Sequence, residues 1–427
     1  MRRYSAPPPT RFAATLIMPI RQKIRPAVRD IVGQLVDNGF EAYIVGGAVR
    51  DLLMDIEPKD YDIATSATPE DVRRVFGRRR SRIIGRRFRL VHVYAGPDVY
   101  EVSTFRRAPS ANERRERLDD DGVMIWRDNE YGTLEQDAER RDLTVNALYY
   151  DPVGDRGIID LVGGVRDLEE RCARAIGDAA TRLEEDPVRM LRALKLVGLF
   201  GFRLDAALEA ALRQRVDRIG LASQNRLFEE LLKILATSRS EPVLEAFQRY
   251  GLLAHFWPAL SAIWDTPVGE RTRRMLAERD RRVDGGEYSS SKALALATVC
   301  LPYVVARLGG PGPDDLWEHD PEKEHHCRDA VQEFFQPFPV SRFFVARVRD
   351  IVLLLPRLSQ QIRVSRLVRH PEYKYGREVF MILGHVCGWP ADRLSGTPPP
   401  QDHGGPGPSR GRRPGGRRAP RPVGREM

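Results

Sequence analysis

Cysteine is scarce in this sequence, and the cysteines that are present lie far apart. Only four occur among 427 residues, at Cys172, Cys300, Cys327 and Cys387, and none belongs to a C-x-x-C pair. Such spacing argues against a disulfide framework. Because unpaired cysteines suit a reducing compartment, we expect a cytoplasmic protein.

Long apolar runs are missing as well. No stretch has the roughly 20 apolar residues that a membrane-spanning helix needs, so we expect no stable membrane insertion. A short apolar patch at residues 12–20 is interrupted by Pro19, which makes it a poor secretory signal. Residues 1–24 are therefore predicted to form a disordered leader.

Two motifs of common enzyme classes are absent. There is no G-x-S-x-G elbow and no G-x-x-x-x-G-K-[ST] loop, which excludes the hydrolase and P-loop classes that depend on them. The run His325-His326-Cys327 could suggest zinc, but adjacent residues rarely bind one ion and no second half follows at finger spacing. We interpret this run as a surface or helix-edge cluster.

Charge of one sign is concentrated at the C-terminus. The net charge is +9, and residues 401–427 contain seven arginines against Asp402 and Glu426, a surplus of five. Proline, glycine and arginine dominate from about residue 396, which predicts a disordered basic tail over 396–427. Polyanions are natural partners for such a tail.

The first part of the chain combines strand and helix patterns. Apolar spacing predicts an amphipathic helix over residues 25–40, and Thr68, Pro69 and Asp71 form a helix-start signature. Strands are predicted at residues 41–45, 59–67, 90–95 and 99–105. We therefore predict an α+β head over residues 25–164, with a mixed or antiparallel sheet and flanking helices.

Beyond residue 164 the strand signal fades. Residues 186–202 and several later segments carry apolar residues at three- and four-residue spacing. A chain of 427 residues is too long for one core, so several domains are expected. We predict an all-helical neck over residues 165–265 and an all-helical body over residues 266–395.

A strand that runs into Gly46 and Gly47 is followed at once by a helix. Glycines allow a phosphate to approach the backbone, and a helix N-terminus offers free N–H groups. Arg50, one turn into the helix, could add a bidentate phosphate contact. Taken alone, this pattern is more often a simple turn.

Three acidic residues are candidates for a metal site. Asp60 and Asp62 are two apart on a predicted strand and would share a face, where their oxygens suit Mg²⁺. An exposed acidic turn is the alternative, although Ile63 and Ala64 continue an apolar strand. Glu101 would complete the set if its strand lies beside theirs, and two cations could then clamp an in-line phosphoryl displacement.

The segment YIVGGAVRDLLMDIEPKDYDIAT resembles the polymerase β-type nucleotidyltransferases, in the branch of tRNA CCA-adding enzymes and bacterial poly(A) polymerases. RRDLTVNALYYD is similar to that family's R-R-D-F-T-x-N motif, and EEDPVRMLRALK to its E-D-x-x-R-x-x-R motif. GRRFRLVHVYAGPDVYEVSTFRR and the basic tail resemble the bacterial poly(A) polymerase group within it. The resemblance covers residues 25–260 and, more weakly, 335–390.

The resemblance implies a template-independent transfer of AMP from ATP to RNA 3′ ends. It implies that Asp60, Asp62 and Glu101 bind catalytic Mg²⁺, with Mn²⁺ as an alternative. Residues implied to bind the nucleotide are Gly46, Gly47 and Arg50 for the triphosphate, Arg141, Asp142 and Asn146 for ribose or phosphate, and Asp186, Arg189 and Arg192 at the base.

The residues themselves support some of these roles. Asp186 and Arg189 are three apart and are expected on one helix face, where an ordinary salt bridge is the alternative. Arg86, Arg87 and Arg89 lie near the presumed active strand and are weak candidates for RNA contact; a solvated charge run is the alternative. His92, on an alternating strand, is interpreted as a packing or RNA-contact residue.

Two positions depart from the family pattern. Asp55 stands where a glycine usually ends the helix, and we expect Asp55 to adopt the left-handed conformation or to cap the helix at small cost. Leu143 replaces the usual phenylalanine of the R-R-D-F motif, where we expect burial to be kept.

Two other functions remain open at this stage. A CCA-adding tRNA nucleotidyltransferase shares the same head and neck, and a non-catalytic RNA-binding protein could use the same scaffold. For the basic tail we favour RNA affinity, with a tether for RNA-decay proteins as the alternative. A monomer is expected.

Overall fold

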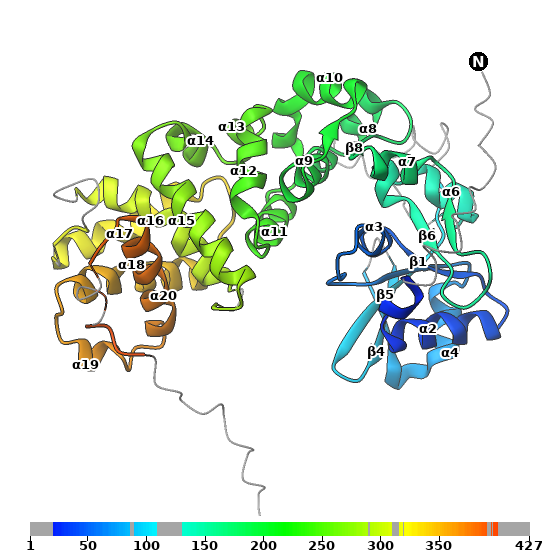
Figure 1. Ribbon diagram of the computed structural model, residues 1–427, viewed down its shortest axis with the longest axis horizontal. Helices are drawn as coiled ribbons and strands as arrows, with labels where there is room; N and C mark the ends of the chain where they lie inside the picture. Colours follow the sequence, from blue (N-terminus) through cyan, green and yellow to red (C-terminus); the bar gives the residue numbers. More distant parts are fainter. Residues whose placement is uncertain are drawn as a thin grey trace, which may run out of the picture.

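The computed structural model describes residues 20–85, 89–108, 130–288, 291–309, 316–318, 320–390, 394 and 396–399. A sheet with helices forms the N-terminal part, and helices make up nearly all of the rest (Figure 1). The predicted α+β head followed by a largely helical region is confirmed. The neck departs from the prediction in one detail, because β8 (Cys172–Ala173) and β9 (Arg203–Leu204) form a small parallel pair.

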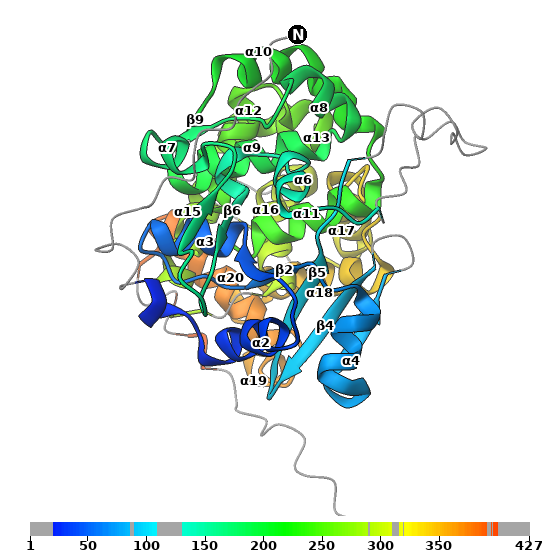
Figure 2. The same ribbon diagram turned by 90° about the vertical axis from the view of Figure 1, so that its right-hand side faces the viewer.

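The head is built on one seven-stranded mixed sheet, ordered β3-β4-β5-β2-β1-β6-β7. Figure 2 shows β4 and β5 of this sheet side by side. Only the β2–β5 pair is parallel, and the other five pairs are antiparallel. The strands are β1 (Ala42–Val45), β2 (Asp62–Thr65), β3 (Ser81–Ile84), β4 (Leu90–Ala95), β5 (Asp98–Thr104), β6 (Leu148–Tyr150) and β7 (Ile158–Asp160).

Helices cover the two faces of this sheet unequally. On one face, α2 (Pro26–Asp37), α3 (Gly47–Leu53) and α4 (Pro69–Arg80) enclose the larger apolar cluster of the head. On the other face, a small cluster packs beneath α6 (Leu134–Glu139) and covers only part of the sheet. The short helices η1 (Thr144–Asn146) and α7 (Gly164–Glu169) lead toward the neck.

Three local sequence features of the head have the conformation or burial that the sequence predicts. Thr68 and Asp71 form a reciprocal capping box at the start of α4, which confirms the predicted helix start. Asp55 has φ 62°, the left-handed conformation that was one of its two expected outcomes. Leu143 is 2% exposed, so burial is kept without the aromatic ring.

Several predicted boundaries are wrong. β2 begins only at Asp62, so Asp60 precedes the strand, and strand β3 was not predicted. The predicted disordered leader is too long, because Ile20 and Ile24 are buried in the head core. The predicted tail starts too early, since Thr397 is buried and its carbonyl accepts a hydrogen bond from Arg377. Residues 1–19 and 400–427 lie outside the described residues.

One apolar core runs through the neck and the C-terminal helices. The cluster continues from Leu143 through Trp264 and Met275 to Val386, so it is not interrupted at the predicted boundary between residues 265 and 266. The neck helices are α8 (Ala179–Glu185), α9 (Val188–Phe200), α10 (Ala206–Arg215), η2 (Val216–Leu221), α11 (Gln224–Leu235), α12 (Ser240–Arg249), α13 (Leu253–Phe256) and α14 (Pro258–Trp264).

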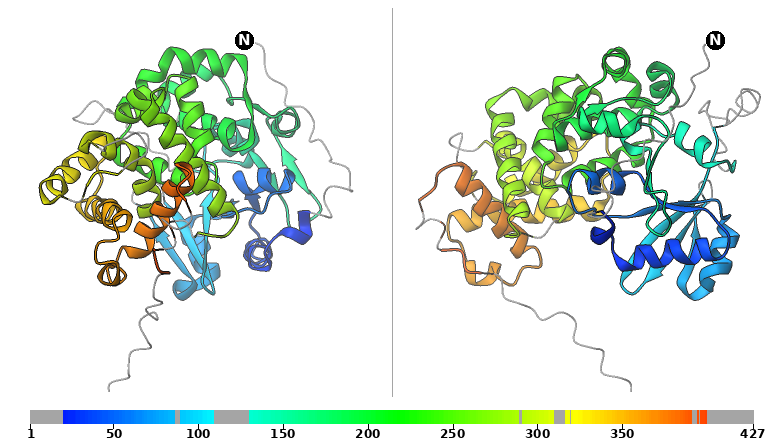
Figure 3. Two further views of the ribbon diagram at one scale, coloured as in Figure 1. Left: turned by 60° about the vertical axis from the view of Figure 1, so that its left-hand side comes forward. Right: turned by 45° about the vertical axis from the view of Figure 1, so that its right-hand side comes forward.

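The body extends the helical array away from the head. In the right-hand view of Figure 3 the neck helices lie between the sheet and the C-terminal helices. No helix among the described residues is long and apolar enough to cross a membrane. The body helices are α15 (Pro267–Asp284), α16 (Lys292–Leu308), α17 (Pro321–Phe334), α18 (Arg342–Ser359), α19 (Val364–Leu367) and α20 (Tyr373–Val386).

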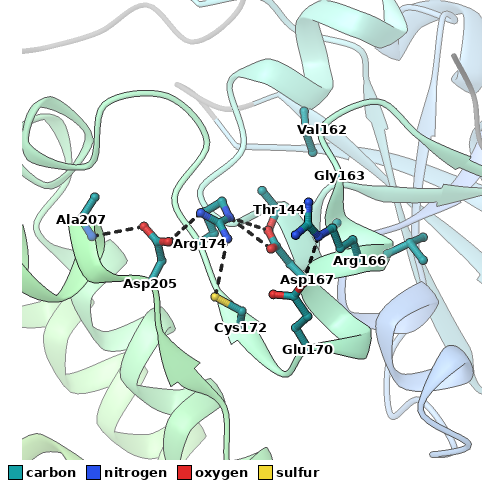
Figure 4. Close-up of polar contacts among 12 residues, drawn as sticks. Thr144, Val162, Gly163, Arg166, Asp167, Glu170, Cys172, Arg174, Asp205 and Ala207 are labelled. Atoms are coloured by element: carbon teal, nitrogen blue, oxygen red, sulfur yellow. Dashed lines mark hydrogen bonds and ion pairs between the residues drawn. The ribbon is translucent and has the colours of Figure 1, made fainter. Parts of the chain in front are cut away.

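A polar joint connects the head to the neck (Figure 4). The guanidinium of Arg174 contacts the buried carboxylate of Asp167 at 3.1 Å and that of Asp205, the cap of α10, at 2.6 Å. Asp167 also accepts a hydrogen bond from the hydroxyl of Thr144 at 2.6 Å. Because charge-assisted bonds of this kind are directional, they orient the neck against the motif that carries the predicted nucleotide residues.

Candidate active site

Asp62 and Glu101 are direct partners on the only parallel strand pair of the sheet. Cα pairing places Asp62 of β2 opposite Glu101 of β5, and Glu101 opposite His92 of β4. Directly paired residues point to the same face, so both predicted carboxylates emerge side by side. Glu101 could complete the predicted carboxylate set only if its strand lies beside the strand of Asp62, and this pairing meets that condition.

The residues paired across the sheet with Asp62 and Glu101 form one row that includes all seven strands. The polarity of the side chains changes along this row. On one side of Asp62 its members are polar, and on the other side they are buried and apolar or aromatic. The buried side belongs to the small cluster beneath α6, which leaves the polar side uncovered. In strand order the row is Arg82, His92, Glu101, Asp62, Val45, Tyr149 and Ile159.

The electrostatics of Asp62 suit a cation. Its side chain reaches solvent, yet the surrounding protein raises the pKa of its carboxyl to about 6. Burial is the largest cause, and the charges of Glu101 and Asp60 add to it, while Arg141 and Lys233 lower the value. A divalent cation would relieve this repulsion, and a set of carboxylate oxygens is its preferred environment.

The side chains themselves do not form a compact cluster. Among the described residues, no three aspartate, glutamate, histidine or cysteine side chains are gathered closely enough to hold a metal ion. Glu101 instead lies 3.6 Å from the Nε2 atom of His92. Adjacent carboxylates repel one another, so a neighbouring imidazole is a natural alternative contact for Glu101.

The glycine turn lies against two of the predicted arginines. Gly46 follows β1 with φ 78° and is the N-cap of α3, which begins at Gly47. A side chain at Gly46 would come within 3.6 Å of Arg141, and one at Gly47 within 3.5 Å of Arg50. The turn therefore brings a glycine backbone and two guanidinium groups together, as phosphate binding requires.

Arg50 is held by groups from three parts of the chain. Its Nη1 donates to the side-chain oxygen of Asn146 at 2.7 Å, and its Nε and Nη2 donate to Asp51. The guanidinium also lies 5.0 Å from the ring centroid of Phe200, at the end of neck helix α9. Two predicted residues, Arg50 and Asn146, are thus in direct contact, while Phe200 was not predicted.

Arg141 is fixed by a buried network. Its guanidinium donates to Asp137 at 3.0 Å and to the Tyr149 hydroxyl at 3.0 Å, and that hydroxyl donates to Asp137 at 2.7 Å. Burial alone would raise the pKa of Asp137, but Arg141 and Arg140 outweigh it and lower the value. Asp137 is therefore an ionised anchor that the sequence did not reveal as part of the site.

Asp142 connects the head motif to the neck. Arg192 of α9 donates to its carboxylate at 3.0 Å. Burial would raise the pKa of Asp142, but the charge and hydrogen bond of Arg192 lower it overall. Both residues were predicted to lie at the nucleotide, and the structure brings them into contact.

The predicted Asp186–Arg189 pair on one helix face is wrong. Asp186 lies between α8 and α9 in an extended conformation, at φ −147° and ψ 93°, because the following Pro187 disfavours helical backbone there. Its carboxylate accepts two bonds from Arg226 of α11, at 2.7 and 2.9 Å. Arg189 instead lies 3.3 Å from Glu185. Arg226 had no recognisable sequence signal, because only the tertiary fold brings α11 to this position.

The three candidate RNA-contact arginines are only partly described. Arg86 and Arg87 lie outside the described residues. Arg89 forms an ion pair with Glu70 of α4, and its carbonyl accepts a hydrogen bond from Arg106 at 3.2 Å. Their RNA-binding role stays a prediction.

A paired-carboxylate sheet beside a glycine turn, with arginines from head and neck around it, is the arrangement expected of a nucleotidyltransferase. The family described as the poly A polymerase head domain matches residues 42–174. The family described as "probable RNA and SrmB-binding site of polymerase A" matches residues 201–263. These matches cover the sheet and most of the neck.

Similarity to individual proteins extends further. The chain is 34% identical to poly(A) polymerase I of Haemophilus influenzae over 84% of this chain and 80% of that protein. It is 32% identical to poly(A) polymerase I of Escherichia coli O157:H7 over 86% and 80%. The chain belongs to the nucleotidyltransferase family of bacterial poly(A) polymerases and CCA-adding enzymes.

CCA-adding enzymes match over a shorter span of sequence. The enzyme of Lactobacillus helveticus is 37% identical over 51% of each chain. Among solved structures, the CCA-adding enzyme of Bacillus stearothermophilus in complex with CTP aligns at a TM-score of 0.58 and 26% identity, covering 88% of this chain and 80% of that one. The fold is therefore common to both branches, whereas sequence similarity along the body favours the poly(A) polymerases.

Proposed function

We propose that this protein adds AMP residues from ATP to RNA 3′ ends without a template. The observation that carries this proposal is the similarity to poly(A) polymerase I over 80% of its length, compared with about half the length of the CCA-adding enzyme. The side-by-side placement of Asp62 and Glu101 supports a catalytic scaffold over a purely RNA-binding one.

In this proposal Asp60, Asp62 and Glu101 hold catalytic Mg²⁺, or Mn²⁺ in its place. When bound, the metal lowers the pKa of an attacking hydroxyl and neutralises charge on the triphosphate. The carboxylates position the RNA 3′-oxygen for in-line attack on the α-phosphorus of ATP. A bond forms between the 3′-oxygen and the α-phosphorus as the bond to pyrophosphate breaks, and the hydroxyl proton is released to solvent.

The remaining residues orient the nucleotide. Gly46, Gly47 and Arg50 receive the triphosphate and the departing pyrophosphate, and Arg141 and Asn146 extend this surface toward the ribose. Asp186, Arg189 and Arg192 read the base, with Asp142 positioning Arg192. The bidentate Arg226–Asp186 contact supports this assignment, because it holds one base-reading carboxylate in a fixed orientation.

The RNA strand is proposed to follow the neck. Residues 201–263 match the family described as "probable RNA and SrmB-binding site of polymerase A", and the charge of Lys233 in α11 lowers the pKa of Asp62. A cation at this position would attract a phosphate backbone toward the carboxylates. The basic tail could add affinity for RNA or tether proteins of RNA decay.

Incorporation of labelled nucleotides tests the function. Unstructured RNA and tRNA lacking its 3′ end are offered ATP or CTP separately, with Mg²⁺ or Mn²⁺. Long products from ATP on unstructured RNA are expected, and they should disappear in Asp60→Ala. Efficient CTP addition to tRNA would identify a CCA-adding enzyme, and metal-dependent binding without incorporation would leave only an RNA-binding protein.

A further inference from the structure

A polar cavity lies in the C-terminal body, remote from the carboxylates. It occupies about 470 Å³ between α17, α18 and the segment that follows α19. This volume falls within the range of about 300–1,000 Å³ that is usual for small-molecule sites. Helices α17 and α18 lie at the opposite end of the molecule from β4 and β5 (Figure 1).

Positive charge prevails in the lining of this cavity. Glu324 is paired with Arg357 through a short contact, and Asp350 is paired with Arg349 at 2.6 Å. These two ion pairs cancel their own charges. Arg328, the third arginine of the lining, has no ion-pair or hydrogen-bond partner among the described residues and supplies the surplus positive charge.

Several hydrogen-bond donors around the cavity remain available. The Nε atom of Arg357 is buried and has no hydrogen-bond partner among the described residues. The described bonds of Arg349 use its Nε and Nη2, which leaves Nη1 for a ligand. A buried donor without a partner is costly, so an acceptor in the cavity would stabilise this arrangement.

The imidazole of His370 provides one more donor. Its Nδ1 accepts the backbone N–H of Glu372 at 3.1 Å. In the neutral ring the proton must then be on Nε2, which makes Nε2 a donor rather than an acceptor. Arginine forks and an imidazole N–H together match the several acceptor oxygens of a phosphate group.

We propose that this α17–α18 cavity binds a phosphate group, through Arg328, Arg349, Arg357 and His370. Two sources share this chemistry: the backbone of an RNA strand and a free phosphorylated small molecule. The proposal does not depend on the transfer reaction, because none of these residues belongs to the candidate active site.

Arg328 is the residue to change, since it is exposed and its replacement leaves no described partner unpaired. The variants are Arg328→Glu and Arg328→Gln in the full chain. Arg342→Glu and Arg342→Gln are the matched controls, because Arg342 is also an exposed arginine of the body but does not line the cavity. Thermal unfolding establishes that each variant is folded.

Binding is measured in EDTA, so that metal-dependent binding at the carboxylates does not contribute. Inorganic phosphate is titrated while the side-chain NMR signals of His370 and His325 are followed, and unstructured RNA is titrated by fluorescence anisotropy. We expect Arg328→Glu to weaken phosphate binding about tenfold or more, with a smaller loss in Arg328→Gln and none in the Arg342 variants.

The RNA titration separates the two sources. If Arg328→Glu weakens RNA and phosphate binding together, the ligand is an RNA backbone phosphate. If it weakens phosphate binding alone, the ligand is a small phosphorylated molecule. Equal phosphate affinity in wild type, Arg328→Glu and Arg342→Glu would overturn the proposal.

Discussion

Asp62 and Glu101 stand directly opposite each other on the only parallel strand pair of the head sheet. Two like charges in this position destabilise the sheet when no cation is present. The arrangement therefore costs stability, and the binding of a cation between the two carboxylates would offset that cost.

Replacing Asp62 with asparagine should separate activity from stability. We expect AMP incorporation to fall more than about 100-fold, since even outer partners of metal ligands cost 10–100-fold. The melting temperature should stay the same or rise, because one repelling charge is lost. Labelled ATP incorporation and thermal denaturation measure the two effects, and Asp98→Asn, which changes an exposed acid at the start of β5, is the control. A strongly unfolded Asp62→Asn variant would contradict this explanation.

Metal binding should depend on pH through the same carboxylate. The pKa of Asp62 is raised to about 6, first by burial and then by Glu101 and Asp60. Since a proton competes with the cation, Mn²⁺ affinity should fall about tenfold for each pH unit below 6 and level off above it. Electron paramagnetic resonance of free Mn²⁺ at several pH values provides the measurement. Asp62→Asn should bind weakly with little pH dependence; an unchanged profile would assign the titration to another group.

Phe200 should influence the handling of ATP although it lies in the neck. Its ring faces the Arg50 guanidinium at 5.0 Å, and a cation–π contact contributes about 0.5–2 kcal/mol. We expect Phe200→Leu to raise the KM for ATP roughly 3- to 10-fold with a smaller change in kcat. Phe202→Leu removes a neighbouring ring without this described contact, so an equal KM increase in Phe202→Leu would indicate a general packing effect instead.

Glu378 should make the body less stable in alkaline solution. Its carboxyl is buried, one oxygen has no hydrogen-bond partner among the described residues, and burial raises its pKa from 4.5 to about 7. Because the folded state favours the protonated acid, the free energy of unfolding should decrease as pH rises from about 4.5 through 7.

Glutamine at position 378 removes this titration. We expect Glu378→Gln to be more stable than wild type at pH 8, by roughly 1–3 kcal/mol at about 1.4 kcal/mol per pKa unit. The difference should shrink toward pH 5. Urea denaturation at both pH values measures it, with Glu322→Gln on the surface of α17 as the control. A constant difference at both pH values would show that ionisation of Glu378 is not the cause.

Much of the head could be predicted because its signals are local. The capping box at Thr68 and Asp71, the turn at Gly46 and Gly47, and the left-handed Asp55 each depend on a few adjacent residues. The interruption of the helix at Asp186 could also have been predicted, because Pro187 follows it. The apolar spacing on both sides instead favoured one continuous helix.

Strand pairing and the contacts between distant helices were decided by the tertiary structure. Alternating side chains could place Glu101 on a face of its strand, but only sheet order sets β5 beside β2 in the register that pairs it with Asp62. In the same way, Arg226 reaches Asp186 and Phe200 reaches Arg50 because separate helices pack together. Caps and turns depend on residues that are adjacent in the sequence, so the sequence by itself determines them. Contacts between distant residues depend on how the apolar faces of whole helices and strands are buried against one another, and only the tertiary structure decides that.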